Sequence, residues 1–573
     1  MKQIIKLFIL SSIILTSCKR NVLDVTPQDR IAETAVWADE SLIKAYESEL
    51  YNAIPHGFFI HMYSKYTDEA YNSAPCCGAD LFKLNTYNPD NIINAGRLGD
   101  FWGSNSGYIY YWDQGYSYIR KINVFLDRMA ASGSLEFADK KRLIAEAKFI
   151  RAFTYFNLIE RFGGVPIVTK SYGLSDAAST TFKRNTFDEC VAFIQKDIDE
   201  ALPDLATKYA STDANYGRAT KDASYALLSR LYLYAASPLF NPNHDNAKWQ
   251  KAAAAAAVFT ENADRGYTLY SNYGNLFNQN SGAAQNEFIL TRNFTSANFH
   301  QAPAHNLGRR YGAYGGWWAS NGPSQNLVDD YDMINGQPAF TWSGNTKTIN
   351  PASNYDPNNP YANRDPRFEA SILHDGSVFQ GTTLDMWVSS TNQQFGYDSW
   401  KQSSDNPRSS YWIRKFMPES QKISFDERYT IPWPYFRLAE IYLNYAEAKF
   451  ELGDEAKARE YINKVRARVG MPAIAATVTG QALRDRLYNE RRIELAFENH
   501  RFFDIRRWKI ANVIENRPIY GKDVLLNMTT NVKTYSPVLL LQKNPYQDKM
   551  NLLPVATDEI KKNKGTLEQT TGW

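Results

Sequence analysis

The sequence predicts a mainly α-helical fold, built as a tetratricopeptide-like array of helix pairs with a large loop-rich insert packed on it. Three observations lead to this prediction. Apolar residues recur at helical spacing in the first and last parts of the chain, a Gly-, Asn- and aromatic-rich stretch at 266–434 separates these parts, and residues 437–470 match a helix-turn-helix repeat of about 34 residues. A chain of 573 residues suits either several domains of about 150 residues or one long repeat array.

The first residues of the chain are typical of an export signal. Residues 1–15 combine two lysines with a short apolar run, below the roughly 20 residues that span a bilayer. The run ends in Leu-Thr-Ser directly before Cys18, which is similar to the bacterial lipobox, where the peptide is cut and the cysteine is lipidated. We therefore expect a signal peptide at 1–17, lipidation of Cys18 and a polar, lipid-anchored tether over 18–40. A plain secretory signal is the alternative.

Residues 41–265 are expected to form the N-terminal helical part. Thr186 has Glu189 three residues later, the arrangement of a capping box, and Gly163 ends the long apolar pattern before it. Consecutive alanines from Ala252 favour a helix and let neighbouring helices approach closely. The pattern predicts helices at 41–53, 107–129, 139–162, 186–202, 221–236 and 247–262.

Helical periodicity is absent from the insert at 266–434, where Gly, Asn, Ser, Pro and aromatic residues dominate. So long an irregular stretch in a folded protein usually carries function, so we expect the ligand-binding region here. Helices return in residues 435–573, a C-terminal helical repeat with a closing segment. Gly453 and Asp454 form the expected turn of the repeat, for which an unrelated helical hairpin is the alternative.

Composition and charge exclude several classes of protein. The net charge of +3 provides no strong global field, which argues against a general nucleic-acid binder. Four cysteines are too few for a disulfide scaffold, and adjacent Cys76 and Cys77 would strain to bridge each other, so no structural disulfide is expected. The unusual feature is the aromatic content of 14%, which suggests aromatic binding surfaces.

Motifs of catalysis and metal binding are absent from the sequence. It contains no HExxH, CxxC, P-loop or GxSxG pattern. The pairs His56/His61 and His300/His305 are each five residues apart and are better explained as surface histidines than as metal ligands. Carboxylates are numerous, but nothing selects a catalytic pair of the kind glycosidases use. The sequence therefore predicts no catalytic residue and no metal site.

Aromatic residues in loops stand out as the candidate ligand site. Flat aromatic faces suit the apolar C–H faces of sugar rings, and neighbouring Asp, Asn and Arg side chains can bond the hydroxyl groups. The alternative is that these rings pack the loops against the helices. The predicted ligand-binding residues are Trp102, Tyr314, Trp317 and Trp318, with the polar groups Asp68, Asn72 and Arg309.

Motifs along nearly the whole chain resemble those of the SusD/RagB-like outer-membrane nutrient-uptake lipoproteins. The mature start after Cys18 is similar to the start of that family, and the C-terminal segment resembles its closing pattern, except for Thr570-Thr571 where Asn-Pro is common. The blocks that carry the resemblance are NVLDVTPQ at 21–28, residues 145–169 (AEAKFIRAFTYFNLIERFGGVPIVT), RDPRF at 364–368, the helix at 437–452, residues 490–508 (ERRIELAFENHRFFDIRRW) and residues 552–573.

The resemblance implies about four tetratricopeptide-like units and no catalysis. It implies a lipid-anchored protein on the cell surface at the outer membrane, where it covers a TonB-dependent transporter (a SusC-like barrel) and captures oligosaccharides. Charged residues of the matching blocks are expected to form internal ion pairs and helix contacts, with ligand residues in variable loops. These scaffold residues are Ala147, Arg151, Glu440, Glu447, Glu490, Arg491 and Glu494.

Two further functions remain open at this stage. The same fold could capture peptides, although a charged cleft or an exposed strand edge would suit a peptide better than loop aromatics. A surface glycosidase is the remote alternative. No cofactor is expected; a calcium ion has no support in the sequence, and the sugar and its linkage are not encoded in any pattern we recognise.

Overall fold

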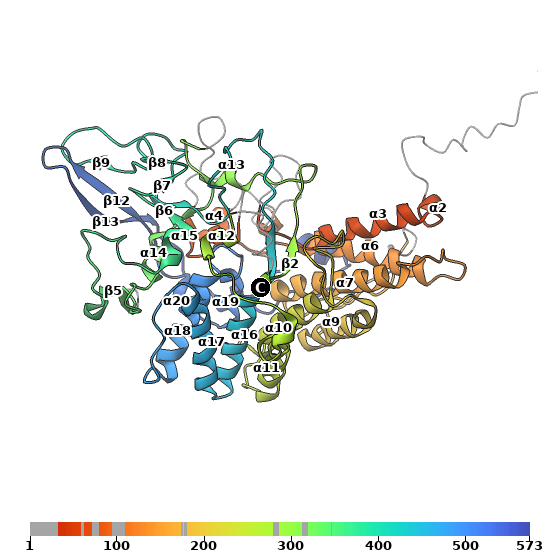
Figure 1. Cartoon of the computed structure of the whole chain (residues 1–573). Helices are drawn as coiled ribbons and strands as arrows, with labels where there is room; N and C mark the ends of the chain where they lie inside the picture. The colour runs from red at the N-terminus through yellow and green to blue at the C-terminus, as the bar shows by residue number, and fades with distance from the viewer. Residues whose placement is uncertain are drawn as a thin grey trace, which may run out of the picture.

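The computed structural model of the chain describes residues 33–58, 62–71, 79–93, 109–173, 176, 180–278, 286–311, 319–344 and 346–573. Its helices form an arc, with a region of short strands and loops packed on one side (Figure 1). The helices are α2 (Glu33–Val36), α3 (Glu40–Leu50), α4 (Ala79–Lys83), α6 (Trp112–Ala130), α7 (Lys140–Phe162), α9 (Phe187–Ala201), α10 (Lys221–Ala236), α11 (Asn246–Thr260), α12 (Tyr273–Leu276), α13 (Ala302–Asn306), α14 (Gln325–Asp330), α15 (Pro366–Ser371), α16 (Leu438–Glu451), α17 (Glu455–Arg468), α18 (Gly480–Glu494), α19 (Arg501–Arg507), α20 (Ala511–Ile514) and α21 (Thr557–Lys562).

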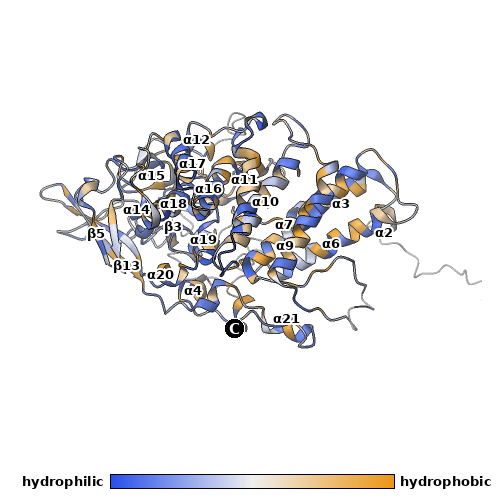
Figure 2. Ribbon diagram, turned by 90° about the horizontal axis from the view of Figure 1, so that it is seen from below, coloured by the Kyte–Doolittle hydropathy of each residue, from blue (hydrophilic) through white to orange (hydrophobic). Residues whose placement is uncertain are grey.

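The predicted tetratricopeptide-like architecture is confirmed. Helix α7 packs against α6 and α9, α10 against α11, and α16 against α17, while α11 also packs on α16 and so continues the array. Figure 2 shows hydrophobic and hydrophilic residues side by side on α3 and α6, as expected for amphipathic helices that each bury one face. In α11 the buried alanines Ala252, Ala253 and Ala256 allow the close approach that their small side chains predict.

Helix ends follow the local signals of the sequence. Helix α9 begins with the predicted capping box: the backbone N–H of Glu189 donates to the Thr186 hydroxyl at 3.2 Å, and the Glu189 carboxylate accepts from the Thr186 N–H at 2.7 Å. Helix α7 ends at Gly163, which has φ of 72°, a conformation open mainly to glycine. Gly453 has φ of 85° and forms the predicted turn between α16 and α17.

Buried ion pairs join the helical array to the insert. Arg437 donates to Glu494 at 2.6 Å, to Glu287 at 2.9 Å and to Glu498 at 2.7 Å, and all four side chains are buried. The scaffold residues predicted to form internal ion pairs do so: Arg151 with Asp197, Glu440 with Arg230, Glu447 with Arg507, Glu490 with Arg367, and Arg491 with Asp504.

Strands are short in the insert and long near the C-terminus. The described strands are β1 (Ala70–Tyr71), β2 (Phe288–Arg292), β3 (Gly322–Pro323), β4 (Phe340–Ser343), β5 (Thr346–Ile349), β6 (Ile372–Leu373), β7 (Val378–Phe379), β8 (Thr382–Thr383), β9 (Val388–Ser389), β10 (Trp412–Ile413), β11 (Trp433–Arg437), β12 (Ile519–Asn527) and β13 (Val532–Leu541).

Two features of these strands go beyond the sequence prediction. The long antiparallel hairpin β12–β13, which also pairs with β9, lies in the part of the chain expected to be a helical repeat and closing segment. Strand β11 pairs with β2 and runs across the boundary expected at residue 434, so the insert is fastened to the first helix of the C-terminal part. Buried apolar side chains of all parts belong to one continuous core.

Candidate functional site

Two of the segments predicted to carry ligand residues, 72–78 and 312–318, lie close in sequence to the two strands of one small sheet, β1 and β3. Strand β1 pairs antiparallel with β3, and Tyr71 lies opposite Gly322. The backbone N–H of Ser324 donates to the carbonyl of Glu69 at 2.9 Å and extends this contact. The chain therefore leaves β1 after Tyr71 at the place where residues 319–321 enter β3. This arrangement brings the stem that precedes Asn72 next to the stem that follows Trp318.

A cluster of arginines and aromatic rings lies beside β3. We call it the arginine–aromatic surface, and it consists of Arg309, Arg310, Tyr397, Trp400 and Arg408. Its closeness to β3 follows from packing at Gly322: a Cβ there would lie 2.8 Å from the Pro407 side chain and 3.0 Å from the Ser409 hydroxyl. Glycine is required because the loop that carries Arg408 presses directly on the strand.

An ion pair fixes the first half of this surface. The Arg310 guanidinium donates to both carboxylate oxygens of buried Asp398 at 2.8 Å and lies 4.5 Å from the centroid of the Tyr397 ring. The hydrogen bond to Asp398 raises the pKa of Arg310 above its ordinary value, so the group stays charged. Tyr397 is 46% exposed. The pair therefore holds Arg310 beside a ring that remains open to solvent.

Trp400 forms the second half. The Arg408 guanidinium lies 3.8 Å from the centroid of its ring, and the Lys401 ammonium lies 4.3 Å away. Arg408 is held by Asp523 of β12 at 2.8 Å. Burial raises the pKa of Tyr71, and the charge of Arg408 opposes this shift, which places the two residues in one electrostatic environment. The hairpin, the 397–408 loop and β1 thus meet at Trp400 and Arg408.

Buried Asn406 connects the two halves of this surface to residues 308–311, which directly precede the 312–318 segment. Its side-chain oxygen accepts from the backbone N–H of Arg309 at 2.8 Å, and its amide donates to the Ser399 carbonyl at 2.9 Å. A Cβ at Gly308 would lie 2.4 Å from the Trp412 ring and 2.6 Å from the Asn406 oxygen. Residues 308 and 309 are therefore closely packed against Trp412 and Asn406.

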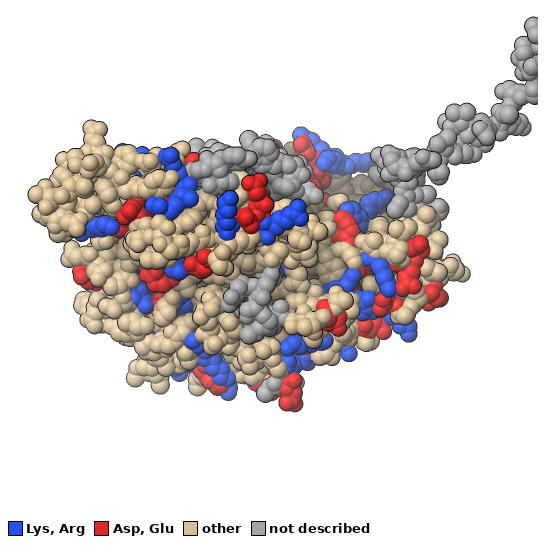
Figure 3. Space-filling view, turned by 45° about the horizontal axis from the view of Figure 1, so that its top comes forward, with Lys and Arg blue, Asp and Glu red and all other residues tan. Residues whose placement is uncertain are grey.

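The arrangement is suited to binding polar rings. An exposed aromatic face can stack on the C–H face of a sugar, and guanidinium groups already aligned by carboxylates can donate to hydroxyls at little entropic cost. On the face in Figure 3, acidic and basic side chains are interspersed, so no field of one sign covers it. Among the described residues, no three His, Cys, Asp or Glu side chains gather in a geometry that would hold a metal ion.

The structure locates two of the predicted ligand residues. Arg309 is half-buried at the centre of the arginine–aromatic surface, where its guanidinium lies 5.8 Å from the Tyr397 ring centroid. Asp68 is buried and binds Arg501 through both carboxylate oxygens, at 2.9 and 3.0 Å, and Arg492 at 2.8 Å. Burial raises the pKa of Asp68, but the charges of Arg492 and Arg501 outweigh this and hold it well below its usual range. This geometry favours a structural role for Asp68.

The other predicted residues lie outside the described residues: Trp102, Tyr314, Trp317, Trp318, Asn72 and the lipidation site Cys18. Their roles stay predictions. Tyr311, the last described residue before Tyr314, packs edge-on against Phe379 and Trp412 and donates its hydroxyl to the Phe379 carbonyl at 2.7 Å. At this stem position the ring is part of the loop packing.

Sequence reasoning did not select Tyr397, Trp400, Arg310 or Arg408 as site residues. The signal that could have found the first two is the run Tyr-Asp-Ser-Trp at 397–400, which places two aromatic residues three positions apart within a polar loop. The contribution of Arg408 has no such signal, because Asp523, which orients it, lies 115 positions away along the chain.

The expectation of surface histidines is wrong for His300, which is buried and stacks on Phe58, whereas His244 is exposed. Burial holds the pKa of His300 down at about 3, and its Nε2 lies 3.2 Å from the Ile431 carbonyl. Cys190 is a buried free thiol. No described helix combines the length and apolarity that crossing a bilayer requires.

Comparison with known proteins identifies relatives over most of the chain. The profile of the SusD family matches residues 249–573, and a profile described as starch-binding associating with outer membrane matches residues 23–233. The chain is 24% identical over 451 residues to the SusD-like protein P25 of Formosa agariphila, which covers 76% of this chain and 77% of that protein.

Two further relatives have informative names or structures. The starch-binding protein SusD of Bacteroides thetaiotaomicron is 27% identical over 382 residues, or 64% of each chain. The crystal structure of a SusD-like protein from Bacteroides fragilis superposes with a TM-score of 0.73 at 26% identity, covering 96% of this chain and 100% of that one.

Proposed function

The chain belongs to the SusD family, and from this premise we propose that it captures oligosaccharides at the bacterial cell surface and delivers them to a TonB-dependent transporter of the outer membrane. The proposed role is binding without catalysis. The observation that carries it is the arginine–aromatic surface, which offers an exposed ring and aligned guanidinium donors beside the stems of segments 72–78 and 312–318.

The ligand is assigned to the carbohydrate class on two grounds. A relative with 27% identity is named a starch-binding protein, and a profile that matches residues 23–233 is described as starch-binding. The site itself combines flat rings with neutralised charges, since Asp398 pairs with Arg310 and Asp523 with Arg408. Such a surface suits neutral hydroxylated rings, for which contacts to C–H faces and hydroxyl groups both contribute.

We place the ligand across Tyr397 and Trp400, with Arg309 and Arg408 as hydrogen-bond donors. The predicted rings Trp102, Trp317 and Trp318, with Tyr314, complete the site from the neighbouring segments. The pairing of β1 with β3 supports this placement for the 312–318 segment, because its C-terminal stem enters the sheet beside Tyr71.

Affinity electrophoresis in gels that contain a panel of neutral polysaccharides tests the proposal. We expect the mature protein to be retarded by at least one polymer of the panel. Trp400→Ala should then weaken calorimetric affinity for an oligosaccharide of that polymer about tenfold to a hundredfold, since stacked rings contribute about 1–3 kcal/mol by analogy with base stacking.

Trp342→Ala provides a matched control. Trp342 also carries an arginine over its ring, with Arg517 at 4.0 Å, but it lies on strand β4 away from the arginine–aromatic surface. Its removal should leave affinity unchanged. Equal losses in both variants, or no retardation by any polymer together with binding of peptides, would contradict carbohydrate capture at this surface.

A further inference from the structure

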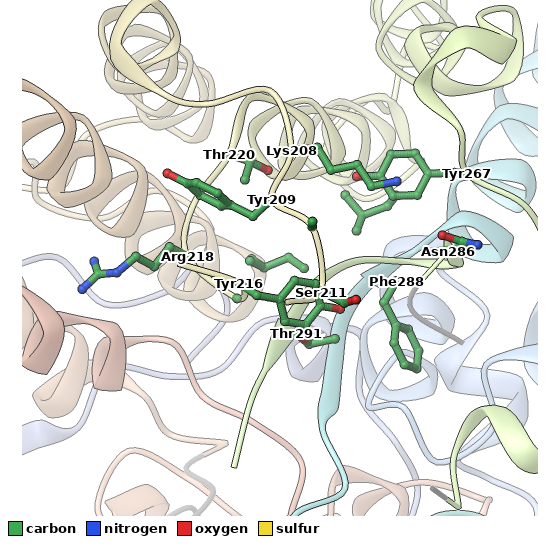
Figure 4. Close-up of a pocket in the computed structure, with 14 residues that line it drawn as sticks. Lys208, Tyr209, Ser211, Tyr216, Arg218, Thr220, Tyr267, Asn286, Phe288 and Thr291 are labelled. Atoms are coloured by element: carbon green, nitrogen blue, oxygen red, sulfur yellow. The ribbon is translucent and has the colours of Figure 1, made fainter. Parts of the chain in front are cut away.

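A cavity of about 230 Å³ lies between the 207–220 loop and strand β2 (Figure 4). The loop is closed at its base, because Lys221 N–H donates to the Ala206 carbonyl at 2.9 Å and Asp222 N–H to the Thr207 carbonyl at 3.3 Å. A loop whose ends meet in this way forms a compact arch. The arch and the strand together enclose space of the size that one small ring fills.

Strand β2 forms the floor of the cavity, and one of its residues has no partner in the register with β11. The register of β2 with β11 matches Phe288, Leu290, Thr291 and Arg292 with partners and skips Ile289, which also lines the cavity. The arch comes close at Gly217, where φ is 96° and a Cβ would lie 2.4 Å from the Asn293 amide. The walls are thus positioned by backbone contacts on both sides.

The charged side chains that line this cavity are all basic. Its lining contains Lys208 and Arg218 and no Asp or Glu. Arg218 is directed away from the cavity in Figure 4 and is neutralised by Glu47, at 2.7 Å, and by Glu146. Three other cavities among the described residues each contain two carboxylates in their lining. These pairs are Glu160 and Glu498, Glu369 and Glu419, and Asp113 and Glu559.

Lys208 is the uncompensated charge. Its ammonium lies 3.9 Å from the centroid of the Tyr267 ring. Burial lowers the pKa of Lys208, and among the described residues Asp222 is the carboxylate whose charge opposes this shift. That carboxylate is already engaged by Arg265 and by the Tyr267 hydroxyl, at 3.1 Å. Lys208 is an exposed residue of the lining, so an anion can reach its ammonium from solvent and gain a charge-assisted hydrogen bond.

Neutral donors and rings complete the lining. Tyr216 and Ser211 contribute hydroxyl groups, and Asn286 contributes an amide, whereas the Tyr209 hydroxyl points away from Lys208 (Figure 4). Burial raises the pKa of Tyr216, so its hydroxyl stays protonated. Hydroxyl and amide donors beside an ammonium are a donor set that suits an oxyanion.

We propose that this cavity, the Lys208 pocket, binds the oxyanion of an acidic sugar residue, either a carboxylate or a sulfate, with the sugar ring against half-buried Tyr267. The proposal rests on the proposed function as a glycan-binding protein and names an acidic residue within the captured class. The pocket is separate from the arginine–aromatic surface, since the two share no residue.

Calorimetry and saturation-transfer NMR with four probes test the proposal: glucuronic acid, glucose 6-sulfate, glucose and inorganic sulfate. We expect at least one of the acidic sugars to bind about tenfold or more tightly than glucose, since a charge-assisted hydrogen bond contributes about 1.5–3 kcal/mol. The two acidic sugars distinguish a carboxylate from a sulfate. Lys208→Gln should abolish the preference, and Lys208→Arg should keep part of it.

Lys251→Gln is the matched control, because Lys251 also covers a tyrosine ring, Tyr232 at 4.4 Å, but lies on α11 outside the pocket. Equal affinity for glucose and both acidic sugars, or an acidic-sugar preference that survives in Lys208→Gln, would overturn the proposal. Binding of inorganic sulfate as tight as that of the sugars would also overturn it, since the ring would then contribute nothing.

The same titrations separate this proposal from the broader one. Retardation by neutral polysaccharides without any acidic-sugar preference would contradict only the proposal for the Lys208 pocket. Acidic-sugar binding that depends on Lys208, in a protein that no polysaccharide retards, would contradict glycan capture at the arginine–aromatic surface. It would still support the proposal for the Lys208 pocket.

Discussion

Individual side chains of the candidate site are oriented before any ligand arrives. Asp398 holds Arg310 and Asp523 holds Arg408, so each guanidinium is directed by a carboxylate on a different segment. Orientation in advance lowers the conformational entropy that binding would otherwise cost. The exposed ring of Tyr397 and the half-buried ring of Trp400, rather than the ion pairs, are then expected to carry most of the affinity.

The predicted tryptophans give the first test at this scale. Trp102→Ala and Trp317→Ala should each weaken oligosaccharide binding by about 1–3 kcal/mol, or roughly tenfold to a hundredfold, because each removes a ring that we expect to stack on the ligand. Calorimetry against the oligosaccharide identified by affinity electrophoresis measures the change. Unchanged affinity in both variants with an unchanged melting temperature would remove these residues from the site. A large fall in melting temperature would instead show that the rings pack the loops.

A buried carboxyl beneath β1 predicts a pH dependence of stability. Burial, opposed by the charges of Arg492 and Arg501, raises the pKa of Glu69 to about 7. Its contribution to stability is therefore present below the unfolded pKa of about 4.3 and is lost as the pH rises through about 7. Glu69→Gln should unfold like the wild type near pH 4 and be more stable at pH 8, by up to about 3 kcal/mol.

Urea unfolding at several pH values measures this difference. The exposed Glu568→Gln is the control and should follow the wild-type profile at every pH. A Glu69→Gln variant that is less stable than the wild type at pH 8 would contradict a raised pKa and would indicate that the ionised carboxylate stabilises the fold.

Single elements are defined by caps and turns that act locally. Helix α9 begins at a complete capping box, and α7 ends at a glycine with positive φ. Such signals depend on neighbours in the sequence, which is why the bounds of α9 and α10 agree with the sequence prediction to within one residue or two.

Thr186→Ala tests the contribution of the capping box. The substitution removes the hydroxyl that accepts from Glu189 N–H at 3.2 Å, and an N-cap substitution of this kind costs about 1 kcal/mol. We expect the urea midpoint to fall without a change in slope. Thr212→Ala, an exposed threonine in the 207–220 loop, should leave the midpoint where it is. Equal midpoints for Thr186→Ala and the wild type would show that α9 does not depend on its cap.

At the scale of the whole molecule, the array and the insert behave as one body. They share one apolar core, and Arg437 links β11 to carboxylates from both parts. A net charge of +3, with acidic and basic side chains interspersed, provides no long-range steering. Capture of a glycan therefore depends on short-range contacts and on the place where the protein is held.

The proposed place is the outer membrane, through Cys18. Cys18→Ala should release the protein from membranes, since acyl chains contribute about 0.8 kcal/mol per buried CH₂ and several are needed for durable anchoring. Fractionation and labelling with a fatty-acid analogue measure the change. A variant that stays with the membrane fraction and still accepts the label would show that the lipobox interpretation is wrong.

The proposed partner is a TonB-dependent barrel. A C-terminal affinity tag, used in native membranes, should recover a large outer-membrane barrel together with this protein. The Cys18→Ala variant is a useful comparison, because it tests whether the complex needs the anchor. Repeated recovery of the lipoprotein alone would count against delivery to a transporter and leave the glycan proposal untouched.

The sequence by itself determined the helical array, because its signals are local. Apolar spacing predicts α7, α10 and α11, the six alanines predict the close packing of α11, and Gly453 predicts the turn of the 437–470 repeat. The hairpin β12–β13 was missed, although its apolar alternation is visible, because short apolar runs suit a strand or a buried helix equally well. Irregular loops have no regular spacing of apolar residues. The sequence therefore predicted the bounds of the insert and its ligand-binding role, but not the short strands within it.

Only the tertiary structure decided which side chains meet. Asp68 and Arg309 look alike as polar residues beside aromatic loops, yet Asp68 is enclosed by Arg492 and Arg501 while Arg309 remains half-buried on the surface. The arginine partners of Asp68 lie more than 400 positions away, and Asp523, the carboxylate that holds Arg408, lies 115 positions away. Lys208 is left without an ion pair for a similar reason: Asp222, the carboxylate whose charge acts on it, is engaged by Arg265. Long-range pairing depends on the fold as a whole, and no local pattern records it.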